Sequence, residues 1–319
     1  PLRQMRAKDS IAYGSKAANL GELIFKRVPG IVVPDGFGVP YAAYAKFMKD
    51  NGFDKIIDDL MDDNAFVHNP RVRRQKLDEF RKTLQNGKFD PALRADIIAR
   101  WKTQLGGKPV FVRSSSNSED LPNFSGAGLY SSVPNVRDED KIIDAVKTVW
   151  ASLWNFQGYE ARVRNYVSQD DVYMSAFIQV GVDMDRGGVM ITKDPFDDLN
   201  KNAVYISAVC GHNTKVTAND GVPEQVLFNP RSNSVVVMTL SQQKGALRFD
   251  PNGDLKETND VCAAGPKKRV LTDLQARQLA RAALLIRSAF PAGKQQDIEW
   301  GIIGPRIYIV QSRPYIEKK

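Results

Sequence analysis

Four residues near the end of the chain have side chains and spacing suited to binding a metal ion and a phosphate. Asp297 and Glu299 are two residues apart in one predicted strand, and Gln311 and Arg313 are two apart at the end of the next. Because side chains two apart share one face of a strand, the pairs can meet if the strands are antiparallel neighbours. Carboxylate and amide oxygens suit Mg²⁺, and an arginine beside them suits phosphate. A cross-strand salt bridge on a solvated sheet explains the same residues equally well.

A second candidate site is a serine-rich segment that follows the predicted strand Val110–Val112. Short side chains and glycines let backbone N–H groups approach phosphate oxygens, and an arginine can bind a phosphate through two hydrogen bonds. The candidate phosphate contacts of this segment are Arg113, Ser114, Ser115, Gly126 and Gly128. Seen alone, such a segment is more often a solvated surface loop. It lacks both the Walker ending and the glycine spacing of dinucleotide-binding loops.

Lys16 is a third candidate, because it lies in the first turn of a predicted helix over residues 15–27. The helix dipole slightly disfavours a cation at this end, and a bound anion would remove the conflict. The ordinary alternative is an exposed surface lysine.

The cysteines and histidines do not have the spacing of a metal site. Cys210 and Cys262 are 52 positions apart (262 minus 210), so we expect two small buried thiols in a reducing, cytoplasmic compartment and no disulfide. His68 and His212 have no partner pattern for a catalytic triad or a metal cluster, and we expect both to be structural.

The length and composition of the chain indicate a folded protein with two lobes. The chain has 319 residues, 42% hydrophobic and 26% charged, which excludes a disordered or low-complexity protein. Its apolar stretches are far shorter than the roughly 20 residues that span a bilayer, so we expect no membrane contact. A net charge of +8 suits a polyphosphate ligand or a nucleic acid, but the basic residues are spread among acidic ones, which makes nucleic acid the weaker interpretation.

The elements that would position these residues divide the chain into a helix-rich first half and a strand-rich second half. Predicted helices cover residues 15–27, several stretches of 41–105 that restart at Asn69-Pro70 and Asp90-Pro91, 138–167 and 273–288. Predicted strands cover 110–112, 173–180, 188–192, 204–209, 225–229, 234–240, 296–302 and 306–311. This order predicts an α+β protein with lobes 1–172 and 173–319, and a cleft between lobes is the default place for a ligand.

Taken together, the motifs resemble one known family. They are Gly14–Leu23 (GSKAANLGEL), Val112–Leu121 (VRSSSNSEDL), and Gln296–Trp300 (QDIEW) with Gln311–Pro314 (QSRP). The chain resembles the ATP-grasp nucleotide-binding domain of the pyruvate phosphate dikinase and phosphoenolpyruvate synthase family, which is related to glucan water dikinases and rifampin phosphotransferase. The resemblance runs in order from about residue 14 to residue 315.

The resemblance implies an ATP-grasp fold in which two lobes hold ATP between them and a phosphoryl group passes to a histidine on a separate domain. By this resemblance Lys16 and Arg113 contact the ATP phosphates, and the segment 114–128 forms a loop over them. Gln179 and Val180, at the end of the predicted strand 173–180, would line the adenine pocket. A plain core strand is the alternative for those two residues.

The same resemblance implies roles for the four residues near the end of the chain. Glu299 and Gln311 would hold Mg²⁺, assisted by Asp297, and Arg313 would stabilise charge on the transferring phosphoryl group. Phosphoryl transfer mainly requires positioning and cationic stabilisation, which agrees with these residue types.

The chain departs from the family pattern in two ways. Where the family has a Gly-Leu-Gly-Glu turn, this sequence has Cys210-Gly211-His212-Asn213. The phosphohistidine domain and the pyruvate-binding barrel are absent from these 319 residues, and the sequence starts at Pro1, so we expect a domain of a longer polypeptide or a different acceptor. The sequence therefore predicts an ATP- and Mg²⁺-dependent phosphotransferase domain, with a catalytically inactive nucleotide-binding regulatory module as the alternative.

Overall fold

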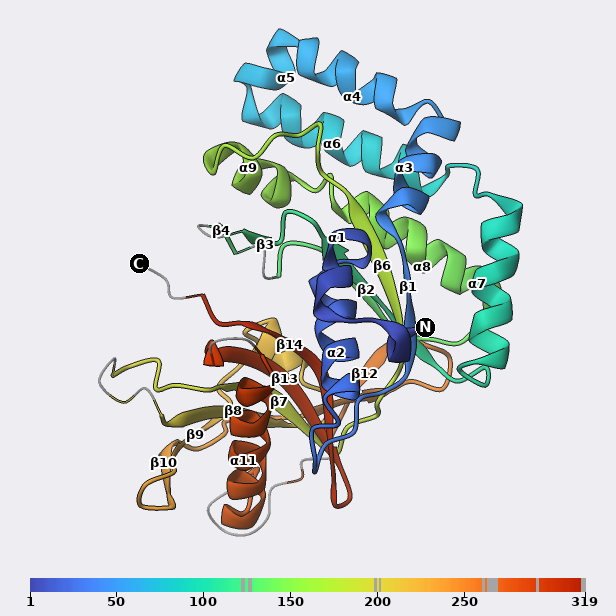
Figure 1. Cartoon of the computed structure of the whole chain (residues 1–319). Helices are drawn as coiled ribbons and strands as arrows, with labels where there is room; N and C mark the ends of the chain where they lie inside the picture. The colour runs from blue at the N-terminus through green and yellow to red at the C-terminus, as the bar shows by residue number, and fades with distance from the viewer. Residues whose placement is uncertain are drawn as a thin grey trace. The chain divides into compact units, whose positions relative to one another are not determined.

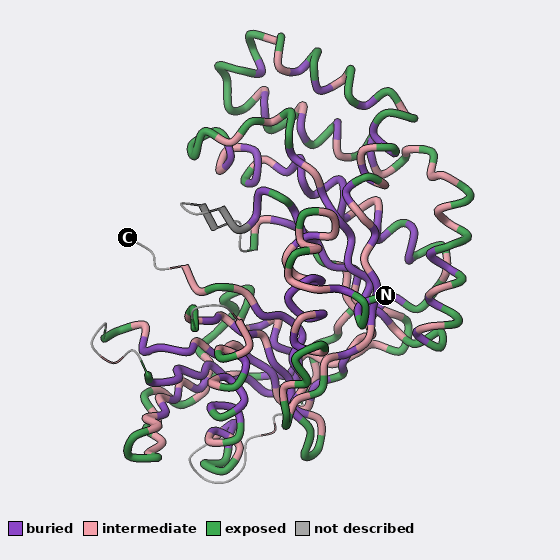
Figure 2. Tube along the Cα trace, viewed as in Figure 1, coloured by how far each residue is buried: buried purple, intermediate pink, exposed green. Residues whose placement is uncertain are grey.

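The computed structural model describes residues 1–121, 124–125, 128–197, 200, 202–259, 262, 269–290 and 293–316. They form two compact units (Figure 1): unit 1 consists of Pro1–Ala18 and Asp35–Gly181, and unit 2 of Asn19–Pro34 and Val182–Lys319. Buried residues follow the strands and the helix faces turned toward them (Figure 2). The predicted α+β class is confirmed. Among the described residues, no helix combines the length and the apolar character needed to cross a membrane.

Most of the helices belong to unit 1. Its first residues form the short turns η1 (Leu2–Gln4), η2 (Ala7–Asp9) and α1 (Ser10–Tyr13), followed by the start of α2 (Ser15–Phe25). The longer helices are α3 (Tyr41–Asp50), α4 (Phe53–Asp62), α5 (Asn64–His68), α6 (Pro70–Gln85), α7 (Pro91–Thr103), α8 (Glu139–Ser152) and α9 (Phe156–Arg164).

Capping side chains fix where several of these helices begin. The side chains of Asn69 and Asp90 accept hydrogen bonds from the first backbone N–H groups of α6 and α7, with proline as the first helical residue. Both predicted restarts are thus confirmed. The predicted single helix over 138–167 is wrong, because Asn155 accepts a hydrogen bond from the backbone N–H of Gly158 and starts a separate helix, α9.

Unit 1 contains a four-stranded antiparallel sheet in the order β1-β6-β2-β5. Its strands are β1 (Gly36–Val39), β6 (Met174–Val180), β2 (Val110–Ser116) and β5 (Ser132–Val136), and the hairpin β3 (Asp120–Leu121) and β4 (Phe124–Ser125) lies outside it. One face of the sheet packs against the helices, through residues such as Val112 and Ile178, which are fully buried in the main hydrophobic core.

Strand β2 extends further than the sequence predicted. The residues Arg113–Ser116 are not loop, because they continue the ladder with β6, where Ser115 pairs with Ser175. Pairing with β6 explains the difference, since a backbone segment in a ladder bonds its polar groups whatever its side chains. The three serines are therefore buried, at 2%, 0% and 4% exposure.

The opposite face of the same sheet is covered by the first residues of the chain. A Cβ atom on Gly38 of β1 would lie 2.8 Å from the ring of Tyr13 and 3.0 Å from the side chain of Met5. These contacts bring the segment before α2 directly onto the strands, so that the start of α2 lies beside β2.

Unit 2 is built on a six-stranded antiparallel sheet in the order β10-β9-β8-β7-β13-β14. Its strands are β7 (Arg186–Ile191), β8 (Val204–Cys210), β9 (Glu224–Asn229), β10 (Ser234–Thr239), β13 (Gln296–Ile303) and β14 (Arg306–Pro314). The other elements are the rest of α2, the one-turn helix α10 (Thr214–Thr217), the hairpin β11 (Ala246–Phe249) and β12 (Leu255–Thr258), and α11 (Asp273–Ala289).

Alternation along these strands separates an apolar face from a polar one. Ile298, Met190, Ile206 and Val226 form a continuous cross-strand row that is fully buried, and α11 packs against the same strands. The neighbouring row, which points to the other face, contains Glu299 and is largely polar.

The two units divide the chain differently from the expected lobes 1–172 and 173–319. Strand β6 lies between β1 and β2 and therefore belongs to unit 1. Residues 19–34 belong to unit 2 because the backbone of Val32 exchanges hydrogen bonds with Ile307 and Ile309 of β14, and the Asn19 amide donates to the carbonyl of Ser312.

Candidate functional site

In unit 1, Lys16 is held against the end of strand β2. Its backbone N–H donates to Ser115 Oγ at 3.2 Å, and its ammonium group forms an ion pair with Glu119. The two paired side chains are only 12% and 5% exposed. A lysine this enclosed is not an ordinary surface residue, so its charge is held in one place.

Gly14 makes this arrangement possible. Its φ of +79° and ψ of 162° lie in a region that only glycine adopts readily, and a Cβ atom there would lie 2.1 Å from Ser115 Oγ. The backbone can therefore pass close to Ser115, which places the Lys16 ammonium group beside Glu119.

We predict that Gly14→Ala destabilises unit 1 by about 3 kcal/mol or more, through backbone strain and overlap with Ser115. The matched control is Gly52→Ala in the same unit, where φ is also positive (+67°) but the space around the Cβ position is open. It should cost about 1–2 kcal/mol. Urea unfolding followed by circular dichroism measures both. Equal losses would show that the contact with Ser115 is unimportant.

Three other predicted residues share the sheet face on which Lys16 lies. Phe111, Arg113 and Ser115 lie two residues apart along β2, so their side chains point to one side of the sheet. Gln179 of β6 pairs with Phe111 and points to the same side. Arg113 and Gln179 are largely buried, at 9% and 2% exposure. Unit 1 thus gathers two cations, a hydroxyl and an amide on one face.

The remaining predicted residues of unit 1 lie elsewhere. Ser114 points to the opposite face of β2, and Val180 packs against the hydrophobic core. Gly128 is exposed, with φ of +74° and open space around its Cβ position. Gly126 lies outside the described residues.

In unit 2, the two strands that carry the four residues near the end of the chain are antiparallel neighbours, as predicted. Glu299 of β13 lies opposite Gln311 of β14, and Asp297 lies opposite Arg313. Arg313 donates from Nε at 3.0 Å and from Nη2 at 2.6 Å to the same oxygen of Asp297. The salt-bridge interpretation therefore holds for Asp297 and Arg313, and leaves Glu299 and Gln311 side by side as the oxygen donors.

These two donors suit a hard cation that also takes ligands from outside the protein. A carboxylate and an amide oxygen are typical Mg²⁺ ligands, and Mg²⁺ usually keeps water and phosphate oxygens in its coordination shell. Throughout the part of the chain that the structure describes, no three His, Cys, Asp or Glu side chains cluster closely enough to hold a metal ion. The residues fit a cation shared with a phosphate ligand better than an all-protein metal cage.

Two residues of these sites were missed as site residues by the sequence analysis. Glu119 appeared only as part of a motif, although it pairs with Lys16. Asn213 appeared only as a departure from a family pattern, yet its amide Nδ2 donates to Glu299 Oε2 at 3.1 Å. No signal in the sequence indicates either contact, because the partners are 103 and 86 residues apart.

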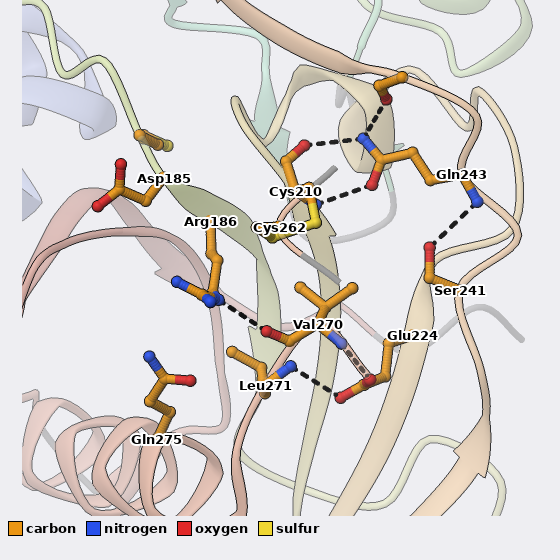
Figure 3. Close-up of a disulfide and its surroundings, with 12 residues drawn as sticks. Asp185, Arg186, Cys210, Glu224, Ser241, Gln243, Cys262, Val270, Leu271 and Gln275 are labelled. Atoms are coloured by element: carbon orange, nitrogen blue, oxygen red, sulfur yellow. Dashed lines mark hydrogen bonds between the residues drawn. A yellow bond between two sulfur atoms is a disulfide. The ribbon is translucent and has the colours of Figure 1, made fainter. Parts of the chain in front are cut away.

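The cysteines form a disulfide, so the prediction of two free thiols is wrong. Cys210 ends strand β8 and bonds to Cys262, with the Cα atoms 5.4 Å apart (Figure 3). Sequence separation carries no information about this distance, which the fold sets by bringing Cys262 to the end of β8. The amide of Gln243 bonds both the N–H and the carbonyl of Cys210 at 2.8 Å, which fixes the same point (Figure 3).

Each histidine contacts a residue of its own local segment. His68 is exposed and contacts the carbonyl of Asn64 in its own helix, whereas His212 is 6% exposed and contacts Thr214 Oγ1 at 2.7 Å.

Comparison with known proteins gives one family and several relatives. The family model described as "Pyruvate phosphate dikinase, AMP/ATP-binding domain" matches residues 11–319. A probable phosphoenolpyruvate synthase of Methanothermobacter thermautotrophicus is 28% identical over 96% of this chain and 44% of its own length. The phosphoenolpyruvate synthase of Deinococcus radiodurans is 30% identical over 98% and 41%, and the rifampicin phosphotransferase of Bacillus subtilis is 28% identical over 98% and 35%. The chain therefore spans less than half the length of these relatives.

Proposed function

Because the chain belongs to the family of pyruvate phosphate dikinase AMP/ATP-binding domains, we propose that it binds ATP with Mg²⁺ and transfers a phosphoryl group from ATP to an acceptor. The observation that carries the proposal is the β13–β14 hairpin, which sets a carboxylate and an amide beside an oriented arginine on one sheet face. Phosphoryl transfer needs little more than positioned ligands and cationic charge, and these residues supply both.

In the proposed mechanism, unit 1 supplies cations and polar groups for the nucleotide. Lys16 and Arg113 bind phosphate oxygens, and Ser115 fixes the backbone at Lys16 through its hydroxyl. Binding of a phosphate at Lys16 competes with Glu119, so the ion pair keeps the lysine oriented until ATP arrives. The adenine and phosphate-loop contacts proposed from the family resemblance are Ser114, Gly126, Gly128, Gln179 and Val180.

Unit 2 supplies the metal site and the charge for the transferring group. Glu299 and Gln311 would hold Mg²⁺, which would neutralise phosphate charge, and Asp297 assists by orienting Arg313. Arg313 then stabilises the equatorial oxygens of the phosphoryl group as it leaves ADP or AMP.

The acceptor is proposed to be a histidine on another domain, either in the same longer polypeptide or in a separate protein. The relatives are more than twice as long as the matched region, which leaves room for such a domain. We also propose a cytoplasmic location. The Cys210–Cys262 bond makes that proposal testable, because cytosolic thiol pools keep most cysteines reduced.

The second candidate is a nucleotide-binding regulatory module without catalysis. The observation that favours it is the neutral Asn213 next to Glu299, which leaves the metal site with less negative charge than a second carboxylate would give. ATP binding without turnover, in the presence of the complete protein and its acceptor, would support this candidate over a phosphotransferase.

Calorimetric titration with ATP, with and without Mg²⁺, tests the proposal. The wild-type chain should bind ATP more tightly with Mg²⁺, and Glu299→Ala should lose this metal-dependent gain because it removes the carboxylate proposed to hold the ion. Asp273→Ala, which removes a carboxylate from the start of α11 in the same unit, is the control and should keep the gain. Absence of ATP binding by the folded wild type would reject the function, and a metal effect that survives Glu299→Ala would reject the metal site.

A further inference from the structure

We infer that Asn213 is the positioning residue of the metal site, holding the Glu299 carboxylate through a neutral hydrogen bond. This inference rests on the proposed function of Glu299. Asn213 is 2% exposed, and its Nδ2 donates to Glu299 Oε2 at 3.1 Å. A buried amide that donates to a partly exposed carboxylate fixes the direction of that carboxylate, because its own position has little freedom.

The turn that carries Asn213 is anchored at each preceding residue. Cys210 is fixed by the disulfide and by the Gln243 amide (Figure 3). The N–H of Gly211 donates to the carbonyl of Asp185 at 2.9 Å, and the N–H of His212 donates to the carbonyl of Leu247 at 2.8 Å. The backbone that leads into Asn213 is therefore fixed by contacts at each of the three preceding residues.

A glycine in the intervening strand lets this turn reach Glu299. Strand β7 lies between β8, which ends in the turn, and β13, which carries Glu299. A Cβ atom on Gly187 of β7 would lie 2.7 Å from the backbone nitrogen of Asn213 and 3.0 Å from the carbonyl oxygen of Gly211. The missing side chain allows the turn to pack on β7 and place the amide next to the strand beyond it.

The neutral partner has a chemical consequence for the cation. Asp297 is balanced by Arg313, whereas the Asn213 amide directs Glu299 without cancelling its charge. Hydrogen-bond partners that orient a ligating side chain affect metal affinity nearly as strongly as some ligands do. Asn213 thus acts on the metal through Glu299 and differs from a catalytic residue, which would touch the reacting atoms.

Two variants and a control test the inference by calorimetry with ATP and Mg²⁺·ATP. Asn213→Ala should weaken Mg²⁺·ATP binding by about 10–100-fold and leave metal-free ATP binding unchanged within about twofold. Asn229→Ala removes another amide of unit 2, one that accepts from the backbone of Arg231, and should change neither affinity. Equal Mg²⁺·ATP affinities for Asn213→Ala and Asn229→Ala would overturn the inference while leaving the proposed function intact.

Asn213→Asp supplies a readout that a purely structural role would not move. Two adjacent carboxylates repel each other without metal, so the melting temperature should fall, and Mn²⁺ or Mg²⁺ should restore it by binding between them. A lowered melting temperature that no divalent cation restores would overturn the inference. This measurement needs no nucleotide. A wild type that fails to bind ATP, with metal-restored stability in Asn213→Asp, would therefore reject the proposed function and retain the positioning role.

Discussion

ATP turnover by a variant in which alanine replaces Arg313 is expected to fall roughly 10³-fold or more, as when a transition-state arginine is removed from other phosphoryl-transfer enzymes. The guanidinium is oriented by two hydrogen bonds to one oxygen of Asp297, so its charge is in place before the phosphoryl group moves. Arg313 is partly exposed on the edge strand β14, and its loss should leave the fold intact. Release of ADP, AMP and phosphate by the complete protein with its acceptor measures the effect.

Two further variants separate the charge of Arg313 from its geometry. Arg313→Lys keeps the charge and loses the planar two-donor group, so its turnover should lie between wild type and alanine. Asp297→Asn keeps Arg313 and weakens its orientation, and should also give an intermediate rate. Wild-type turnover in Arg313→Ala would contradict the assignment of Arg313 to the transferring group.

Loss of the disulfide is the second large effect, and it acts on stability. Cys210 and Cys262 close a loop across a sequence separation of 52 residues, and the chain-entropy relation assigns such a cross-link about 4 kcal/mol. Treatment with dithiothreitol, or the substitution Cys262→Ser, should therefore lower the free energy of unfolding of unit 2 by about this amount. Calorimetric melting of the two forms side by side measures it.

The chain provides its own control for this experiment. It contains only two cysteines, so dithiothreitol has no other disulfide to reduce and should leave the melting of Cys262→Ser unchanged. Identical melting of oxidised and reduced wild type would mean that the bond adds no stability. A bond that is absent from protein isolated under thiol-blocking conditions would instead support the reducing compartment expected from the sequence.

Local patterns predicted those parts of the structure that local physics determines. The Asn-Pro and Asp-Pro helix starts were predictable because capping involves residues within three positions of each other. The antiparallel pairing of the strands that carry Asp297 and Arg313 was predictable because a short turn joins them. The exact partners were not, because a bulge between Glu299 and Trp300 shifts the register by one residue. The family comparison confirmed the resemblance drawn from the motifs.

The parts that sequence reasoning missed depend on contacts between distant segments. Arg113–Ser116 looked like a loop because serines and an arginine are unusual in a buried strand, and only their pairing with β6, more than fifty residues later in the chain, makes them one. The same limit applies to the disulfide and to Asn213, whose partners are set by the order of strands in the unit 2 sheet. The residue types alone do not indicate which distant residues become their partners in the fold.

Residues 19–34 precede most of unit 1 in the sequence but belong to unit 2, which affects the order in which the protein can fold during synthesis. Val32 leaves the ribosome long before β14, whose edge it covers through hydrogen bonds with Ile307 and Ile309. During translation this segment has no β14 to pair with while the contiguous stretch 35–181 of unit 1 is synthesised and can fold. A recombinant fragment that begins at Val182 would lack this cover and expose a bare strand edge, which favours aggregation. Adding residues 19–34 as a separate peptide should restore its solubility.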